Sequence, residues 1–483
     1  MTSRVALSKS ADPGLAHVGG FAALHDELDY TVPVSRITGA LPAELRGTFF
    51  RIGPGRNELG GKAFGHWFDG DGMLHRITFR DDGVHYLNRY VRTPKFLAET
   101  AAGKVVCRSF GHNVPGGVLK NAGRLPANAA NTSLIWHGGH LLALWEGGRP
   151  WELDPATLET LGEFDYDGRL GKTNAFSAHG TVDPRTGCYY NFGIGVGLRG
   201  PGIDFYRIDP RGCLDRKVHI PLGFAPFCHD FALTEHYAVF FINPLYVKHP
   251  LKFIAGLCSF NDALVYEPAH GMQALVVSLD TLEVVRRFEL APFVSVHFGN
   301  SWEDGRQLVI NVTRFEDWSV NAALTTIFHA RNEAKGTLWQ YRLDLASGSV
   351  EGIALPGQDS IEFPQWDHRR TGVQTRYTYA ATVLPNATPG FFNGVQRLDH
   401  HTGEVRVRDF GPDRFTSEAM FAPRHPDSAE DDGFLVAAVY DAARHGTDIV
   451  VLDARTLEDV AVVPLRHHMP FGFHCGYTAR AFV

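Results

Sequence analysis

Short apolar or aromatic runs with period-two alternation dominate the chain, and turn dipeptides separate them. Typical runs are "GHLLALWEGG", "HYAVFFINP", "RQLVINVTRF" and "GFLVAAVYDA". Such alternation places one face of a strand in a core and the other toward solvent, whereas helical periodicity is scarce here. The pattern predicts an all-β protein.

A motif of an apolar residue, Asp and a turn recurs at intervals of about 55 to 70 residues. An Asp at this point is expected to open a tight turn in the outer hairpin of a small antiparallel sheet. Seven such sheets predict a seven-bladed β-propeller, a ring that closes when the N- and C-terminal strands share a blade. The seven positions are Asp82, Asp154, Asp209, Asp280, Asp344, Asp399 and Asp453.

Composition narrows the possible partners and locations. The formal net charge of −7 argues against a nucleic-acid partner, which normally needs a basic face. The first twenty residues, "MTSRVALSKSADPGLAHVGG", lack the apolar region of a signal peptide, and no stretch approaches the roughly 18 apolar residues that span a bilayer. We therefore expect a cytoplasmic protein that is soluble or, at most, peripherally membrane-associated.

The chain has 24 histidines, and four of them share a local setting. Each lies between apolar or aromatic residues at the end of a strand-like run, so rings on different blades would point toward the propeller axis. From spacing alone, isolated core or surface histidines remain an alternative, and imidazole ligation suits Fe, Zn, Cu or Ni equally. The four are His179, His229, His297 and His474.

Several longer motifs occur in a fixed order between Leu41 and Tyr477. They are "GTFFRIGPGRNE", "HWFDGDGMLHRITF", "LLALWEGG", "IEFPQWD", "SEAMFAPR" and the terminal "FGFHCGY". On these motifs the chain resembles the carotenoid cleavage oxygenase family. The resemblance implies a seven-bladed propeller with a cap of loops and short helices over one face. Residues 41–483 would form a single oxygenase domain, and residues 1–40 an N-terminal extension packing on it.

The same resemblance implies a metal site. One Fe(II) per chain would be held by the four histidines, and three glutamates would fix the second ring nitrogen of their imidazoles; the glutamates are Glu146, Glu362 and Glu418. Thr132 would lie beside an open coordination position, although a strand threonine making a cross-strand contact is an equal alternative. No catalytic side chain is expected beyond the metal site.

The activity implied by the resemblance is cleavage of a conjugated double bond of a carotenoid or apocarotenoid by O2, giving two aldehydes. Stilbene-cleaving members carry a Lys directly before the first glutamate, and Trp145 at that position favours an apolar polyene. Three alternatives remain open: a stilbene or phenylpropanoid dioxygenase, an isomerohydrolase, and a propeller binding module without chemistry. Which bond is cut, the substrate length and the oligomeric state do not follow from the sequence.

A long polyene needs an apolar tunnel, because it offers hydrogen-bonding groups only at its ends. The aromatic residues that are candidates for the lining of such a tunnel are Trp145, Phe224, Phe293, Phe298, Trp302 and Phe471, and ordinary core packing is the alternative for each of them. The segment that begins at Phe240 and ends at Phe260, "FFINPLYVKHPLKFIAGLCSF", mixes Lys with apolar residues and is expected to lie at a membrane surface. A loop packed over the propeller face is the alternative.

Overall fold

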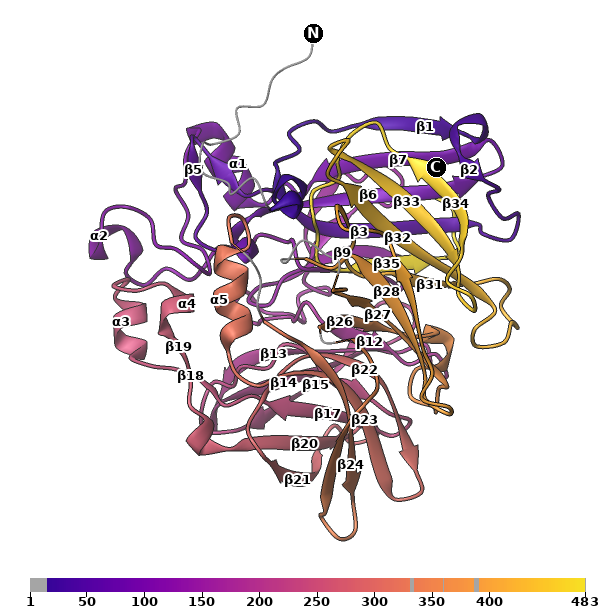
Figure 1. Cartoon of the computed structure of the whole chain (residues 1–483). Helices are drawn as coiled ribbons and strands as arrows, with labels where there is room; N and C mark the ends of the chain where they lie inside the picture. The colour runs from indigo at the N-terminus through magenta and orange to yellow at the C-terminus, as the bar shows by residue number, and fades with distance from the viewer. Residues whose placement is uncertain (1–14, 331–333, 359, 386–390, 483) are drawn as a thin grey trace.

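Strands account for most of the fold (Figure 1). A computed structural model describes residues 15–482, except 331–333, 359 and 386–390. In this part of the chain, seven antiparallel sheets of four to six strands form a ring, and two further sheets have two strands each. The all-β prediction and the seven-bladed propeller are confirmed.

We number the blades from the sheet that contains the N-terminal strands. From the outermost strand inward, blade 1 contains β1 (Asp29–Pro33), β7 (Gly83–Tyr90), β6 (Asp71–Arg80), β3 (Gly47–Arg56) and β35 (Cys475–Thr478), and blade 2 contains β11 (Thr160–Glu163), β10 (Trp151–Leu153), β9 (His140–Leu144) and β8 (Ser133–His137). Blade 3 contains β15 (Leu214–Pro221), β14 (Gly200–Ile208), β13 (Tyr189–Gly197) and β12 (Gly180–Val182). Blade 4 contains β21 (Val284–Leu290), β20 (Met272–Ser278), β17 (Tyr237–Ile242) and β16 (Ala232–Leu233).

The last three blades follow the same order. Blade 5 contains β25 (Val350–Ala354), β24 (Thr337–Asp344), β23 (Gln307–Phe315) and β22 (Val294–Asp304). Blade 6 contains β29 (Val405–Asp409), β28 (Gly394–Asp399), β27 (Tyr377–Thr382) and β26 (Ile361–Gln365). Blade 7 contains β2 (Thr38–Gly39), β34 (Asp459–Pro464), β33 (Gly446–Asp453) and β32 (Gly433–Asp441), and β32 pairs with both β30 (Arg414–Phe415) and β31 (Met420–Pro423).

The predicted aspartate turns are visible in the outer hairpins. Asp154 Oδ1 accepts hydrogen bonds from the backbone N–H groups of Ala156 and Thr157 at 2.9 and 2.8 Å. The carboxylates of four further aspartates accept backbone N–H groups two to four residues later in the same way; these are Asp209, Asp344, Asp399 and Asp453. In the turn at Asp280, the acceptor is instead the hydroxyl of Ser278, which accepts from the backbone N–H of Asp280.

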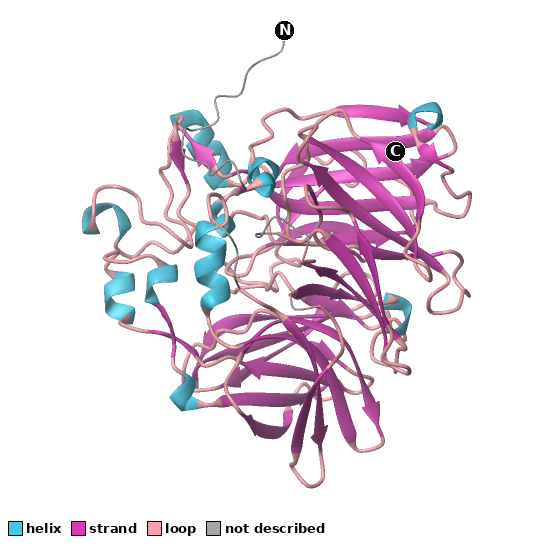
Figure 2. Cartoon of the chain, viewed as in Figure 1, coloured by secondary structure: helices cyan, strands magenta, loops and turns pink. Residues whose placement is uncertain are grey.

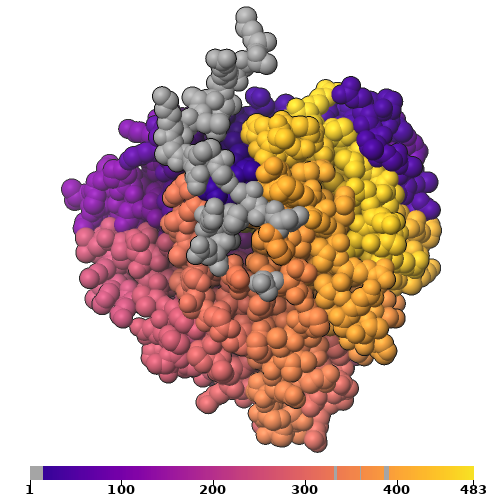
Figure 3. Space-filling view, in the orientation of Figure 1, coloured from indigo at the N-terminus to yellow at the C-terminus, as the bar shows by residue number. Residues whose placement is uncertain are grey.

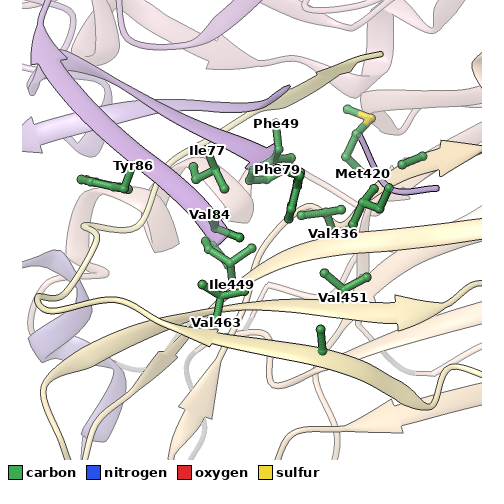
Figure 4. Close-up of a cluster of buried hydrophobic side chains, with 14 of the residues drawn as sticks. Phe49, Ile77, Phe79, Val84, Tyr86, Met420, Val436, Ile449, Val451 and Val463 are labelled. Carbon is green, nitrogen blue, oxygen red and sulfur yellow. The ribbon is translucent and has the colours of Figure 1, made fainter. Parts of the chain in front are cut away.

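A separate hydrophobic cluster fills each space between neighbouring blades. Figure 4 shows the cluster between blades 7 and 1, where Phe49 and Phe79 meet Val436 and Val451. Corresponding clusters join the other six pairs of blades. Burying apolar side chains from both sheets stabilises the ring, since each blade alone would expose its inner faces.

The two ends of the chain close the ring, as the sequence predicts. β35 pairs with β3 in blade 1, with Cys475 opposite Arg51, and β2 pairs with β34 in blade 7. Segments from the two ends of the sequence therefore lie side by side, as their indigo and yellow surfaces show (Figure 3). Residues 29–39, within the expected N-terminal extension, supply the outermost strands of these two blades.

Most of the short helices gather on one side of the strands (Figure 2). They are α1 (Pro94–Ala102), α2 (Val118–Asn121), α3 (Pro250–Ile254), α4 (Phe260–Ala263), α5 (Ser319–Thr326) and the 3-10 helix η1 (Ala16–Phe21). The Thr93 side chain caps the first turn of α1, and a buried ion pair of Lys95 with Asp71 joins the helix to β6, while a second pair, of Lys95 with Glu99, lies within the helix. In the described part of the chain, every helix is too short or too polar to cross a bilayer.

The segment from Phe240 to Phe260 differs from its prediction. Its first residues belong to β17, and Phe240 and Phe241 are fully buried between blades because the strand contributes to two inter-blade clusters. The remainder forms the connection to β20 and includes α3 and α4. An amphipathic surface segment is therefore excluded for the first residues of this stretch.

Candidate metal centre

The innermost strand of each blade carries a candidate site residue at or near its start. Because these seven strands are the innermost of their blades, residues near their starts can approach one another at the axis. In order from blade 1 to blade 7 the residues are His474, Thr132, His179, His229, His297, Glu362 and Glu418. Glu146 follows β9, the neighbour of β8 in blade 2.

The four predicted histidines converge. One ring nitrogen from each lies within 4.8 Å of the corresponding atom of every other, and all four rings are buried or half-buried. The His179 ring lies 4.3 Å from that of His229 and 4.6 Å from that of His474, between ring centroids. Residues separated by up to 295 positions (474 − 179) thus form one cluster.

Each of the three predicted glutamates faces one of these imidazoles. Glu362 Oε2 accepts from His297 Nδ1 at 2.5 Å, and Glu418 Oε1 accepts from His474 Nδ1 at 3.2 Å. Glu146 Oε1 lies 3.0 Å from Nδ1 of His229. A carboxylate at Nδ1 keeps the proton there and leaves the Nε2 lone pair for a metal ion.

These contacts fit a bound cation. With protons on Nδ1, the Nε2 lone pairs of His229 and His297 face each other at 3.3 Å, an arrangement that is repulsive without a positive charge between them. Nε2 of His179 is buried, and no described residue forms a hydrogen bond with it. Two nitrogens bound to one ion lie at most about 4.2 Å apart, so movements below about 1 Å would bring all four within reach.

Electrostatics favour the same conclusion. Burial lowers the pKa of His179 well below its usual value, and the other three imidazoles lower it further, so this ring is neutral and able to ligate. Burial alone would lower the pKa of His297, but the Glu362 carboxylate raises it above the usual value. Burial would raise the pKa of Glu362, yet the imidazole and its hydrogen-bond donors lower it. The ionised Glu362 therefore attracts positive charge to this site.

Thr132 is buried directly before β8, and its hydroxyl donates to Asn131 Oδ1 at 3.0 Å. Asp230, which was not predicted, adds a further carboxylate. Its Oδ1 accepts from Phe231 N and its Oδ2 from Phe298 N, at 2.7 and 2.9 Å. Asp230 thereby joins the segments that carry His229 and His297. The only signal in the sequence was its position directly after a candidate ligand, in "CHDFAL".

Phe363 is the second residue that the sequence did not indicate. Its ring stacks on His297 at 5.3 Å and meets His474 edge-on at 5.4 Å, between centroids. Its φ of 57° lies in the left-handed region, at a bulge between β26 and β27. A bulky residue held in this conformation costs about 1–3 kcal/mol, and such strain is concentrated at functional sites.

A cavity of about 830 Å³ extends from His179, His297 and His474 along the inner strands of the propeller. Of the predicted tunnel residues, Phe298 lies in its wall. Phe293 instead packs between blades 4 and 5, stacked on Tyr341 at 5.3 Å. Buried or half-buried sites away from this wall hold Trp145, Phe224, Trp302 and Phe471. A separate tunnel through these residues stays a prediction.

Fold and site together define a class of protein, a seven-bladed β-propeller with a cluster of four histidines on its axis that could hold a metal ion. A family model described as retinal pigment epithelial membrane protein matches residues 21–479. The chain therefore belongs to this family, the carotenoid cleavage oxygenases, and the resemblance noted in its motifs is confirmed.

Known proteins align with nearly the whole chain. Apocarotenoid-15,15'-oxygenase from Synechocystis sp. is 33% identical, over 94% of this chain and 94% of its own. Carotenoid 9,10(9',10')-cleavage dioxygenase 1 from Pisum sativum is 31% identical, over 94% and 88%. Lignostilbene-alpha,beta-dioxygenase isozyme III from Sphingomonas paucimobilis is 30% identical, over 88% of each chain.

Solved structures give the same result. A crystal structure of an ACO/RPE65 chimera superimposes with a TM-score of 0.88 and 30% identity, covering 97% of this chain and 100% of that chain. A crystal structure of cobalt-substituted Synechocystis ACO has the same score, identity and coverage. The propeller topology is therefore shared over its full length.

Proposed function

We propose that this protein is an Fe(II)-dependent dioxygenase that cleaves one conjugated double bond of a carotenoid or apocarotenoid. The observation that carries the proposal is the convergence of four imidazoles, three of which face carboxylates, on the axis of the propeller. One alkene and one O2 give two carbonyl products. The atoms balance without an external reductant or a proton donor.

The four histidines would hold one Fe(II) per chain and leave up to two positions open. When bound, the ion supplies the binding and activation of dioxygen beside the alkene. The three glutamates keep the imidazoles oriented through Nδ1, and Thr132 would border an open position. The remaining work of the protein is to position the double bond and to exclude water. No side chain is assigned as a general acid or base.

Trp145 favours a polyene over a phenol as substrate. Its indole is 8% exposed and precedes Glu146, the position at which stilbene-cleaving members carry a Lys. The ring packs against Gly147, where an added Cβ would lie 2.8 Å from it. The indole lies away from the wall of the cavity and carries no charge, whereas a phenolate bound at this position would need a charged donor.

Substrate uptake from a membrane is proposed for one apolar patch. Leu251 and Leu257 of the predicted segment are 79% and 63% exposed, and Leu119 of α2 is 95% exposed. The two regions are adjacent, because Gly123 N donates to Ile254 O at 2.8 Å. Exposed leucines with Lys and Arg nearby are typical of a lipid-facing surface. The part contributed by α2 was not predicted from the sequence.

The decisive test is incubation of the Fe(II)-loaded protein with a panel of apocarotenals and stilbene phenols, followed by mass spectrometry. We expect two aldehydes from an apocarotenal, and 18O2 is expected to label them. Cleavage of the phenols alone would favour the stilbene alternative, for which the lignostilbene relative is the specific support. A product without oxygen from O2 would indicate the isomerohydrolase alternative.

Metal analysis separates the enzyme from a binding module. We expect about one Fe per chain after reconstitution, and loss of both metal and activity in His297→Ala. A chain that binds no metal would contradict the proposal. We further propose that residues 41–483 act as one domain, since a hydrophobic cluster joins each pair of neighbouring blades.

A further inference from the structure

Each glutamate that faces a metal-site histidine is itself contacted by a neutral hydrogen-bond donor. Ser177 Oγ lies 3.3 Å from Glu146 Oε2, and Thr313 Oγ1 lies 2.9 Å from Glu362 Oε1. The third donor is the amide of Gln365, and its Nε2 lies 2.6 Å from Glu418 Oε1. This last contact is the shortest of the three, and the residue that makes it has no role in the mechanism proposed above.

Gln365 links three consecutive blades. It ends β26 of blade 6, Glu418 precedes β31 of blade 7, and His474 precedes β35 of blade 1. Glu418 Oε1 accepts from both Gln365 Nε2 and His474 Nδ1, while its Oε2 accepts from Cys475 N at 2.5 Å. The carboxylate is therefore held by donors from both neighbouring blades.

A fourth side chain fixes the orientation of the Gln365 amide. His368 Nε2 lies 2.8 Å from Gln365 Oε1. Because a carboxylate only accepts hydrogen bonds, the amide nitrogen must face Glu418 and the carbonyl must face His368. Burial lowers the pKa of His368, so its ring is neutral, and the Nε2–H tautomer completes the contact. The ring also stacks on Trp366 at 4.6 Å, which holds it in place.

We propose that Gln365 is a positioning residue for the metal centre. His368 donates to Gln365, Gln365 donates to Glu418, and Glu418 accepts a second hydrogen bond from His474. Glu418 is kept as an acceptor, the Nδ1 proton stays on His474, and the Nε2 lone pair points to the metal. Replacing the amide by an acceptor would place two carboxylates against each other and release Glu418 from this geometry. The inference rests on the proposed function, since it assumes a metal at the four histidines.

Cobalt binding tests this role without any turnover. The wild type, Gln365→Glu and Gln365→Met would each be loaded with Co(II). The visible absorption of the bound ion and the rate at which a chelator removes it would then be measured. Mutation of a group that orients a ligating histidine changes metal affinity by about 10- to 100-fold, and Gln365 acts on such a group, so its effect is expected at the lower end of this range. We expect dissociation about tenfold faster in Gln365→Met and faster still in Gln365→Glu, with a shifted absorption band in both. His368→Phe keeps the stacking and should give a smaller change of the same sign.

Gln340 provides a matched control. It is also 8% exposed, but its amide donates to Asn311 Oδ1 at 3.2 Å instead of to a carboxylate. Gln340→Glu and Gln340→Met should keep the wild-type cobalt spectrum and dissociation rate, even if thermal stability falls. Equal changes at both positions would mean a general packing effect and would overturn the proposal.

The outcomes separate this inference from the proposed function. If wild type binds cobalt at one equivalent and both Gln365 variants keep its spectrum and dissociation rate, the positioning role is refuted and the metal site stands. If wild type binds no cobalt, both fail. Should Gln365→Glu not fold, Gln365→Met and His368→Phe decide the question by the same two measurements.

Discussion

Glu362→Gln isolates the charge of one carboxylate at the metal centre. Glu362 Oε2 accepts from His297 Nδ1 and from Phe363 N, and its Oε1 contacts Thr313 Oγ1. A glutamine can keep all three contacts, because its oxygen can replace Oε2 while its nitrogen donates to the threonine hydroxyl. That hydroxyl can in turn donate to His297 O, 3.1 Å away. The substitution therefore removes charge with little change in geometry.

The expected loss follows from the hydrogen bonds that remain. A hydrogen bond to a charged group contributes about 1.5–3 kcal/mol, and a neutral one about 0.5–1.5 kcal/mol. The difference of about 1–1.5 kcal/mol corresponds to about 5- to 13-fold weaker metal binding. Glu362→Ala also removes the acceptor, so a loss nearer to about 100-fold is expected.

Competition with a coloured chelator would measure Co(II) or Fe(II) affinity for the wild type and both variants. Glu430→Gln is the control, since the Glu430 carboxylate accepts backbone N–H groups as Glu362 does, here from Arg376 and Tyr377 at 2.8 Å each, but faces no metal-site histidine. Unchanged affinity in Glu362→Gln, or an equal loss in Glu430→Gln, would refute the reasoning that this charge supports the ligand.

Three further predictions concern stability, closure and membrane contact. Burial lowers the pKa of His17 to about 4 from 6.5, so the contribution of this neutral ring to stability is complete above pH 6.5 and is lost as the pH drops toward 4. The free energy of unfolding of His17→Leu, measured in urea, should therefore decline less steeply than that of the wild type over this range, by up to about 1.4 kcal/mol per pH unit. A Cβ on Gly53 would lie 2.2 Å from the Cα of Gly472, in the segment that leads to His474, so Gly53→Ala should lower the melting temperature and the cobalt occupancy. Gly446→Ala should change neither quantity, because its Cβ would meet its nearest atom at 3.8 Å. Leu251→Ser should weaken sedimentation with anionic vesicles, and Leu198→Ser, an exposed site on blade 3, should not; equal effects would contradict the proposed patch.

Local patterns in the sequence were sufficient for the blades. Period-two alternation identified the strands, and the aspartate turns at Asp154 and Asp453 have the predicted local hydrogen bonds. The prediction for Phe240 was wrong, because an apolar run does not reveal whether its partner is a membrane or a neighbouring sheet. Residues 118–125 were missed for a related reason, since their exposure depends on how the cap folds.

The amino-acid sequence by itself determined the number of blades, the closure of the ring and, through its motifs, the four histidines of the site. Only the tertiary structure showed that Asp230 joins the segments that carry His229 and His297, that Phe363 contacts two of the imidazoles and that Gln365 donates to a carboxylate from the next blade. The physical reason is the range of the forces involved. Alternation and turn chemistry act between residues near in sequence, whereas a hydrogen bond between blades depends on sheets whose packing closes only in the complete ring.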